Sequence, residues 1–111
     1  MKSTAAAGLA LAALAFGVAC GSPTSGVPVE RLWAEHCVRC HGADGKGDPR
    51  RLAFDPAVDL LRSRLIADRA KGLIFQRIAQ GNGGMPGFGY KLERGDIEML
   101  VQYVLERFGG K

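Results

Sequence analysis

Cysteine and histidine are scarce in this chain, which has three cysteines and two histidines among 111 residues. Three of these five residues lie between Cys37 and His41, so only Cys20 and His36 remain elsewhere. A structural zinc site takes about four nitrogen or sulfur ligands, and the chain does not offer them. A thioredoxin-like dithiol needs a strand-helix-strand setting, and no strand run leads into the cysteine pair. Neither kind of site is therefore expected.

Long apolar runs and alternating runs are also lacking. The longest apolar stretch, from Ala5 to Ala19, is short for a membrane span but typical of the hydrophobic part of a signal peptide. No segment alternates apolar and polar residues for long enough to indicate a strand, whereas spacings of three and four are common. We therefore expect an all-α domain.

Charge of one sign is nowhere concentrated. Fifteen lysines and arginines oppose eleven acidic residues, for a formal net charge of +4, and among the arginines only Arg50 and Arg51 are adjacent. A protein that binds nucleic acid would normally carry a basic stripe or cluster. We expect no nucleic-acid partner.

The chain does contain the run Cys37-Val38-Arg39-Cys40-His41. Two thiols separated by two residues and followed directly by histidine form the attachment signature of a c-type haem. Each thiol adds across one haem vinyl group, and the adjacent histidine becomes the proximal iron ligand. We predict that Cys37 and Cys40 hold one covalent haem c and that His41 is an axial ligand.

Met85 is the leading candidate for the other axial position. It lies in a glycine-rich segment from Gly81 to Gly89, where flanking glycines allow close approach to a flat ring and Pro86 stiffens the chain. Met99 falls beside the apolar stripe of a predicted helix and fits less well, and His36 shares a short helix with the attachment site. With both axial positions filled, no open site remains for a small-molecule substrate, and the chemistry expected is transfer of one electron.

Helical periodicity and end signals predict the main elements. The first helix is expected to begin at Pro28 and run to residue 39. A short helical segment is expected over 57–65, and another helix from Asp68 as its N-cap to Gly81, with Leu73 facing inward. The last helix, residues 94–108, has its apolar residues at intervals of three and four.

The N-terminal residues are expected to lie outside this domain. We predict a signal peptide over 1–19, a flexible linker over 20–27 and the helical domain over 28–111. Cys20, followed by the small and polar residues 21–26, resembles the modified cysteine of a bacterial lipoprotein, which would make it a membrane anchor. Gly17 departs from that pattern, because lipoprotein signals usually carry leucine there, so ordinary cleavage stays open.

Taken together, these motifs resemble a small class I cytochrome c. The resemblance rests on Trp33 four residues before Cys37, the run from Cys37 to Gly42, the loop 45–48, the segment 81–88 and the last helix. It implies a class I cytochrome c fold of three to five helices wrapped around one covalently attached haem c, with the first and last helices crossing near the haem. It also implies a proline carbonyl that accepts a hydrogen bond from His41, with Pro49 as the candidate and Pro56 as the alternative.

The function that this resemblance implies is that of a one-electron carrier in a respiratory or related chain, not an enzyme. It would be exported to the periplasm or the outer face of a membrane, with redox proteins as donor and acceptor. The alternative is a haem-based sensor or small peroxidase in which Met85 leaves the iron.

Overall fold

The structure is a computed structural model that describes residues 3–5, 8, 10 and 21–110. Most of the predicted signal peptide, and Cys20, lie outside these residues. In the described part the secondary structure is helical, apart from an isolated bridge between Asn82 and Met85. None of the described helices is both long and apolar enough to cross a membrane.

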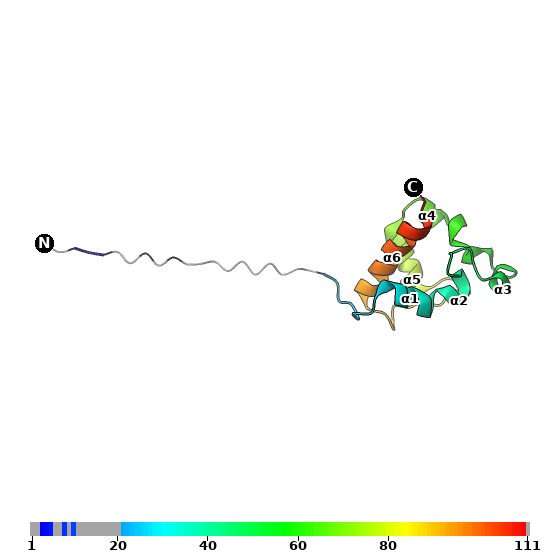
Figure 1. Cartoon of the computed structure of the whole chain (residues 1–111), viewed down its shortest axis with the longest axis horizontal. Coiled ribbons are helices and arrows are strands. Elements are labelled where there is room, and N and C mark those ends of the chain that lie inside the picture. The colour runs from blue at the N-terminus through cyan, green and yellow to red at the C-terminus, as the bar shows by residue number, and fades with distance from the viewer. Residues whose placement is uncertain (1–2, 6–7, 9, 11–20, 111) are drawn as a thin grey trace.

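Three helices of at least eight residues form the body of the domain, and short helical turns connect them. In chain order the elements are α1 (Val29–His36), α2 (Val38–His41), α3 (Pro49–Leu52), η1 (Pro56–Val58), η2 (Leu60–Arg62), α4 (Arg64–Ala67), α5 (Lys71–Gln80) and α6 (Arg94–Phe108). Figure 1 shows α1 and α5 beside α6, while α2 and α3 extend to the opposite end of the domain from residues 22–27.

The core lies where α1 and α5 pack on α6. Its buried members are Leu32, Trp33, Ile66, Ile74, Ile78, Phe88, Ile97, Leu100, Val101, Val104, Leu105 and Phe108. Half of these residues come from the predicted apolar stripe of α6, and the bounds of α6 agree with the predicted helix. The all-α fold of the prediction is therefore confirmed.

Two predicted helix boundaries were wrong. The first helix is interrupted at Cys37, where α1 has ended and α2 has not yet begun. Asp68 does not open a helix; it ends α4, and Arg69 then takes a left-handed backbone conformation with φ of 51°, which separates α4 from α5. The start of α5 at Lys71 leaves Leu73 53% exposed, whereas Ile74 and Ile78 are buried.

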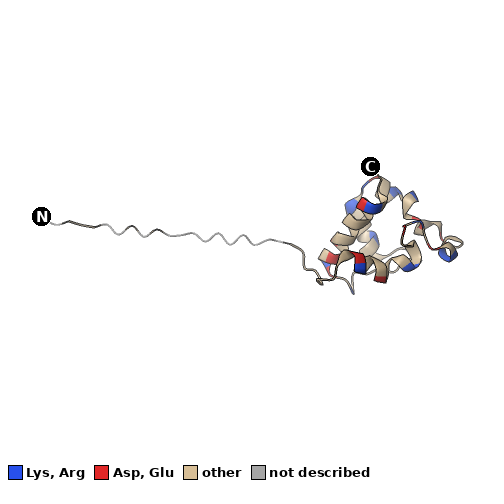
Figure 2. Cartoon of the chain, viewed as in Figure 1, with Lys and Arg blue, Asp and Glu red and all other residues tan. Residues whose placement is uncertain are grey.

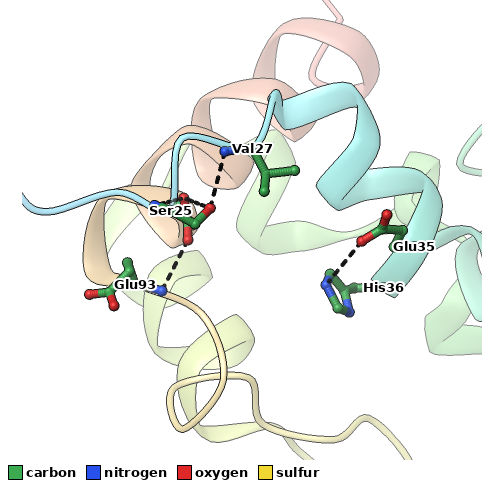
Figure 3. Close-up of polar contacts among 6 residues, drawn as sticks. Ser25, Val27, Glu35, His36 and Glu93 are labelled. Atoms are coloured by element: carbon green, nitrogen blue, oxygen red, sulfur yellow. Dashed lines mark hydrogen bonds and ion pairs between the residues drawn. The ribbon is translucent and has the colours of Figure 1, made fainter.

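Residues 22–27, here called the N-terminal segment, pack on the beginning of α6, although the sequence predicted them as part of a flexible linker. The Gly95 amide donates to the Pro23 carbonyl at 2.8 Å. The Asp96 carboxylate, 0% exposed, accepts from the Ser25 amide and hydroxyl at 3.0 Å each and from the Glu93 amide at 3.1 Å. Figure 3 shows Ser25 beside Glu93 in this cluster. One buried carboxylate thus joins the N-terminal segment to the last helix.

Replacing Asp96 with asparagine is expected to destabilise the protein by about 2 to 3 kcal/mol, because hydrogen bonds to a buried charged group are lost. The amide nitrogen of asparagine would also face the backbone N–H groups of Ser25 or Glu93, which can only donate. Urea unfolding of the haem-loaded protein measures this change. Glu98→Gln is the matched control, since Glu98 also bonds to this segment, through Ser22, but from an exposed position. Equal destabilisation by both substitutions would contradict the assigned role of Asp96.

Candidate haem site

The two cysteines and His41 are brought onto one turn of helix at the junction of α1 and α2. The Cys37 amide bonds to the Trp33 carbonyl of α1, and the Cys37 carbonyl in turn accepts from the amides of Cys40 at 3.2 Å and His41 at 2.9 Å. All three side chains are half-buried. The predicted attachment residues therefore lie on a compact, hydrogen-bonded platform.

The environment of Cys37 favours an uncharged sulfur. Burial, together with the nearby Cys40, raises the pKa of the Cys37 thiol to about 12. Cys37 and Val38 also pack against the buried core cluster. A neutral thioether is better suited to such a position than a thiolate, because burial in apolar surroundings disfavours the charged form.

The orientation of His41 is set by a backbone carbonyl. Its Nδ1 lies 2.8 Å from the Val58 oxygen. Because a carbonyl can only accept, Nδ1 must carry the proton, and Nε2 keeps its lone pair. A ring nitrogen held in this way fixes the tautomer and raises the basicity of the other nitrogen toward a metal. Nε2 is therefore the ring nitrogen through which a neutral His41 could bind a metal.

The prediction that Pro49 or Pro56 supplies this carbonyl was wrong. Pro49 begins α3, and Pro56 begins η1, where its own carbonyl accepts from the Asp59 amide at 3.2 Å. Val58 ends η1, and its carbonyl is the one that reaches His41. The proline thus starts the turn, and the residue at the end of the turn makes the hydrogen bond.

Trp33 packs between the terminal helices and against His41. Its ring centroid lies 5.2 Å from that of Phe108 and 5.5 Å from that of Tyr103. The ring also stacks on the imidazole of His41, with a centroid distance of 6.2 Å and an interplanar angle of 22°. Within the described residues, Trp33 Nε1 is the buried side-chain nitrogen or oxygen that lacks a hydrogen-bond partner. A buried donor seldom stays unpaired, so this one indicates an acceptor supplied by a bound group.

Met85 lies in a tight turn after α5. The amide of Met85 donates to Asn82 at 2.9 Å, and the amide of Asn82 donates back to Met85 at 3.0 Å. Beyond the turn, Phe88 and Gly89 donate to the carbonyls of Ile78 and Ala79, so the loop folds back onto the end of α5. We call residues 81–89 the Met85 loop. Its methionine is half-buried and packs against the same core cluster as Cys37.

The other candidate ligands are engaged differently. Met99, on α6, lines a shallow surface groove with Val29 and Glu30. His36 pairs with Glu35 at 3.9 Å, as Figure 3 shows. The His36 ring also packs on Phe88 at 5.6 Å, which connects α1 to the Met85 loop. Asp55 lies near this loop without bonding to it, since a Cβ added to Gly84 would be 4.0 Å from Asp55 Oδ2.

These residues suit a covalent haem. Two thiols and a histidine share one helical turn, and the Val58 carbonyl holds the histidine in the tautomer that leaves Nε2 available to iron. The buried Nε1 of Trp33, which has no partner, lies on the ring stacked against this histidine. Met85 packs on the same core as Cys37. Sequence reasoning missed the carbonyl of Val58 and the position of Asp55 near the Met85 loop. The dipeptide Asp55-Pro56, which opens η1, was the available signal for that turn.

Comparison with known proteins identifies the family and the fold of the chain. Residues 27–104 match the family described as cytochrome c oxidase, cbb3-type, subunit III. The cbb3-type cytochrome c oxidase subunit FixP of Bradyrhizobium diazoefficiens is 30% identical over 83 residues, which cover 74% of this chain. The matched region spans only 27% of that relative's length. The solved KustC0563 c-type cytochrome shares the fold with a TM-score of 0.62 at 23% identity, over 72% of this chain and 96% of its own.

Because the family match covers most of the helical domain and the solved structure has the same fold, the chain belongs to the family of cytochrome c oxidase, cbb3-type, subunit III, and is a small c-type cytochrome with covalently bound haem c.

Proposed function

We propose that this chain is a one-electron carrier whose haem is attached through Cys37 and Cys40 and whose iron is ligated by His41 and Met85. The observation that carries the proposal is the hydrogen bond from His41 Nδ1 to Val58, at 2.8 Å, because it leaves Nε2 as the nitrogen available to iron. The hydrogen-bonded Met85 loop supports the second ligand, since its methionine packs on the same core as Cys37.

Each of these residues has a specific task in the carrier. When bound, haem supplies an iron that changes oxidation state by one electron. His41 is held by Val58 and need not rotate, and Met85 is held by paired backbone hydrogen bonds and need not leave. A fixed ligand pair keeps the structural change on oxidation small. The neutral thioether of Met85 favours the reduced iron, which raises the reduction potential.

The setting of the carrier is a respiratory chain outside the cytoplasm, with other redox proteins as donor and acceptor. The support is the similarity to a relative described as a subunit of a cbb3-type oxidase and the signal-peptide-like stretch at the N-terminus. Cys20, outside the described residues, is the proposed lipid attachment site. No small-molecule substrate is proposed, and the chain acts as a carrier and not as an enzyme.

Carbon monoxide tests the closed iron site. The reduced haem-loaded protein at neutral pH is expected to show no change in its absorption spectrum over minutes of exposure, because Met85 occupies the position that the gas would take. Myoglobin, with an open site, serves as the positive control for the gas solution. Rapid binding would overturn the carrier assignment and favour the sensor or peroxidase alternative, in which Met85 dissociates.

A further inference from the structure

The loop that follows the haem-attachment helix exposes an aromatic side chain. We call residues 48–58 the Phe54 loop. Phe54 is 89% exposed, the largest value among the large apolar side chains of the described residues. Its backbone is nonetheless fixed, because the amides of Phe54 and Asp55 both donate to the Arg51 carbonyl, at 3.0 and 2.8 Å. A phenyl ring held in water in this way contributes little to the stability of the fold.

The charges around Phe54 are unequally exposed. Asp48, Asp55 and Asp59 are half-buried, and each accepts a backbone amide at 3.0 Å, from Arg50, Ala57 and Leu61 respectively. The side chain of Arg50, in contrast, is 95% exposed, and Arg51 is exposed as well. Figure 2 shows this basic ribbon on α3, at the end of the domain away from the N-terminal chain. Arg50 Nε lies 3.9 Å from Asp48 Oδ1, a surface ion pair that leaves the guanidinium group in water. The loop therefore presents an apolar tip beside two exposed arginines.

The Phe54 loop is hydrogen-bonded to the segment that carries Cys40 and His41 and lies near the Met85 loop. At its start, the Asp48 amide donates to the Cys40 carbonyl at 2.9 Å, and at its end the Val58 carbonyl holds His41. Between these points, Asp55 approaches Gly84, the neighbour of Met85. A protein that covered Phe54 would therefore contact the loop whose two ends bond to Cys40 and His41.

We propose that the Phe54 loop is the docking surface for the redox partner, and that the partner presents an apolar patch ringed by carboxylates. The inference rests on the proposed electron-carrier function. An apolar centre supplies contact area and a charged rim supplies orientation and a faster encounter. Contacts between redox proteins are usually small, so one exposed aromatic ring and two arginines form a substantial part of such an interface.

Electrodes with defined coatings test the surface without an identified partner. Haem-loaded protein is studied by voltammetry on gold that carries either carboxylate-terminated thiols alone or a mixture of carboxylate- and methyl-terminated thiols. Phe54→Ser is expected to slow electron exchange about tenfold on the mixed coating, as follows from losing part of the transfer free energy of a phenyl group. On the pure carboxylate coating its rate should change less than twofold. Arg50→Gln/Arg51→Gln should weaken adsorption on both coatings, and more so at low salt.

Tyr90→Ser is the matched control, because Tyr90 is 83% exposed but lies outside the Phe54 loop. It should leave both rates within twofold of the unsubstituted protein. Loss of the mixed-coating rate in Tyr90→Ser but not in Phe54→Ser would overturn the proposed docking surface. Exchange with a small neutral mediator in solution is measured for every variant and should be unchanged. If the unsubstituted protein fails to exchange reversibly even in solution, the electron-carrier function itself is overturned, and the docking proposal with it.

Discussion

Met85→Ala is expected to abolish the weak far-red sulfur-to-iron charge-transfer band of the oxidised protein. Alanine cannot bring sulfur to the iron, so the sixth position opens to water or another weak ligand. The reduction potential should fall by on the order of 0.1 V or more, well within the ~0.8 V range over which axial ligands set haem potentials. The optical spectrum and potentiometric titration measure these changes.

Met99→Ala provides the matched control for this experiment. Met99 is also half-buried and also packs against the core, but it lies on α6 beside a surface groove. Its replacement should leave the band and the potential unchanged. A band that persists in Met85→Ala would refute the proposed ligand pair, and its disappearance in Met99→Ala would place the sulfur ligand on α6.

Gly81→Ala is expected to be the most destabilising single-methyl change in the Met85 loop. Gly81 has φ of 76°, and a Cβ there would meet the carbonyl of Met85 and lie 2.6 Å from the Gly87 nitrogen. A left-handed conformation costs a non-glycine residue about 1 to 2 kcal/mol, and forcing a methyl group into packed backbone costs roughly 1 to 3 kcal/mol more. A total of about 3 kcal/mol would lower the Tm of a domain of this size by roughly 12 to 24 °C.

Gly83→Ala separates the two contributions to that loss. Gly83 has φ of 54° in the same loop, but a Cβ there would meet no atom within 4 Å. Thermal unfolding should therefore show only the conformational cost in Gly83→Ala and the full cost in Gly81→Ala. The far-red band should also weaken only in Gly81→Ala, because that clash displaces Met85. Equal effects of the two changes would show that backbone packing at Gly81 does not hold the loop.

The parts of this molecule that could be predicted from sequence are those encoded by local spacing. The apolar residues of α6 recur at helical intervals, so this helix was predicted correctly. Cys37, Cys40 and His41 stand together in one short motif, from which the haem c cofactor was predicted, and the family match confirms the cofactor. The roles of these three residues as attachment and ligand residues stay predictions. The assignment of Met85 as iron ligand rests on a loop composition and stays a prediction.

The parts that could not be predicted depend on backbone groups and on distant contacts. Every residue has a carbonyl, so side-chain identity could not indicate that Val58, and not a proline, faces His41. The N-terminal segment has the small polar composition of a linker, yet its Ser25 meets the buried Asp96 from 71 positions away. The left-handed backbone at Arg69, which separates α4 from α5, likewise has no glycine to indicate it.

The attachment of the N-terminal segment to α6 also places residues 22–27 at one end of the domain. The chain leaves the domain beside the beginning of α6, and Figure 1 places α2 and α3 at the opposite end. Residues 22–27 and the Phe54 loop therefore lie at opposite ends of the domain. Under the proposed lipid attachment at Cys20, the Phe54 loop would face away from the membrane, so the proposed anchor would set the orientation of the proposed electron exchange as well as the location of the protein.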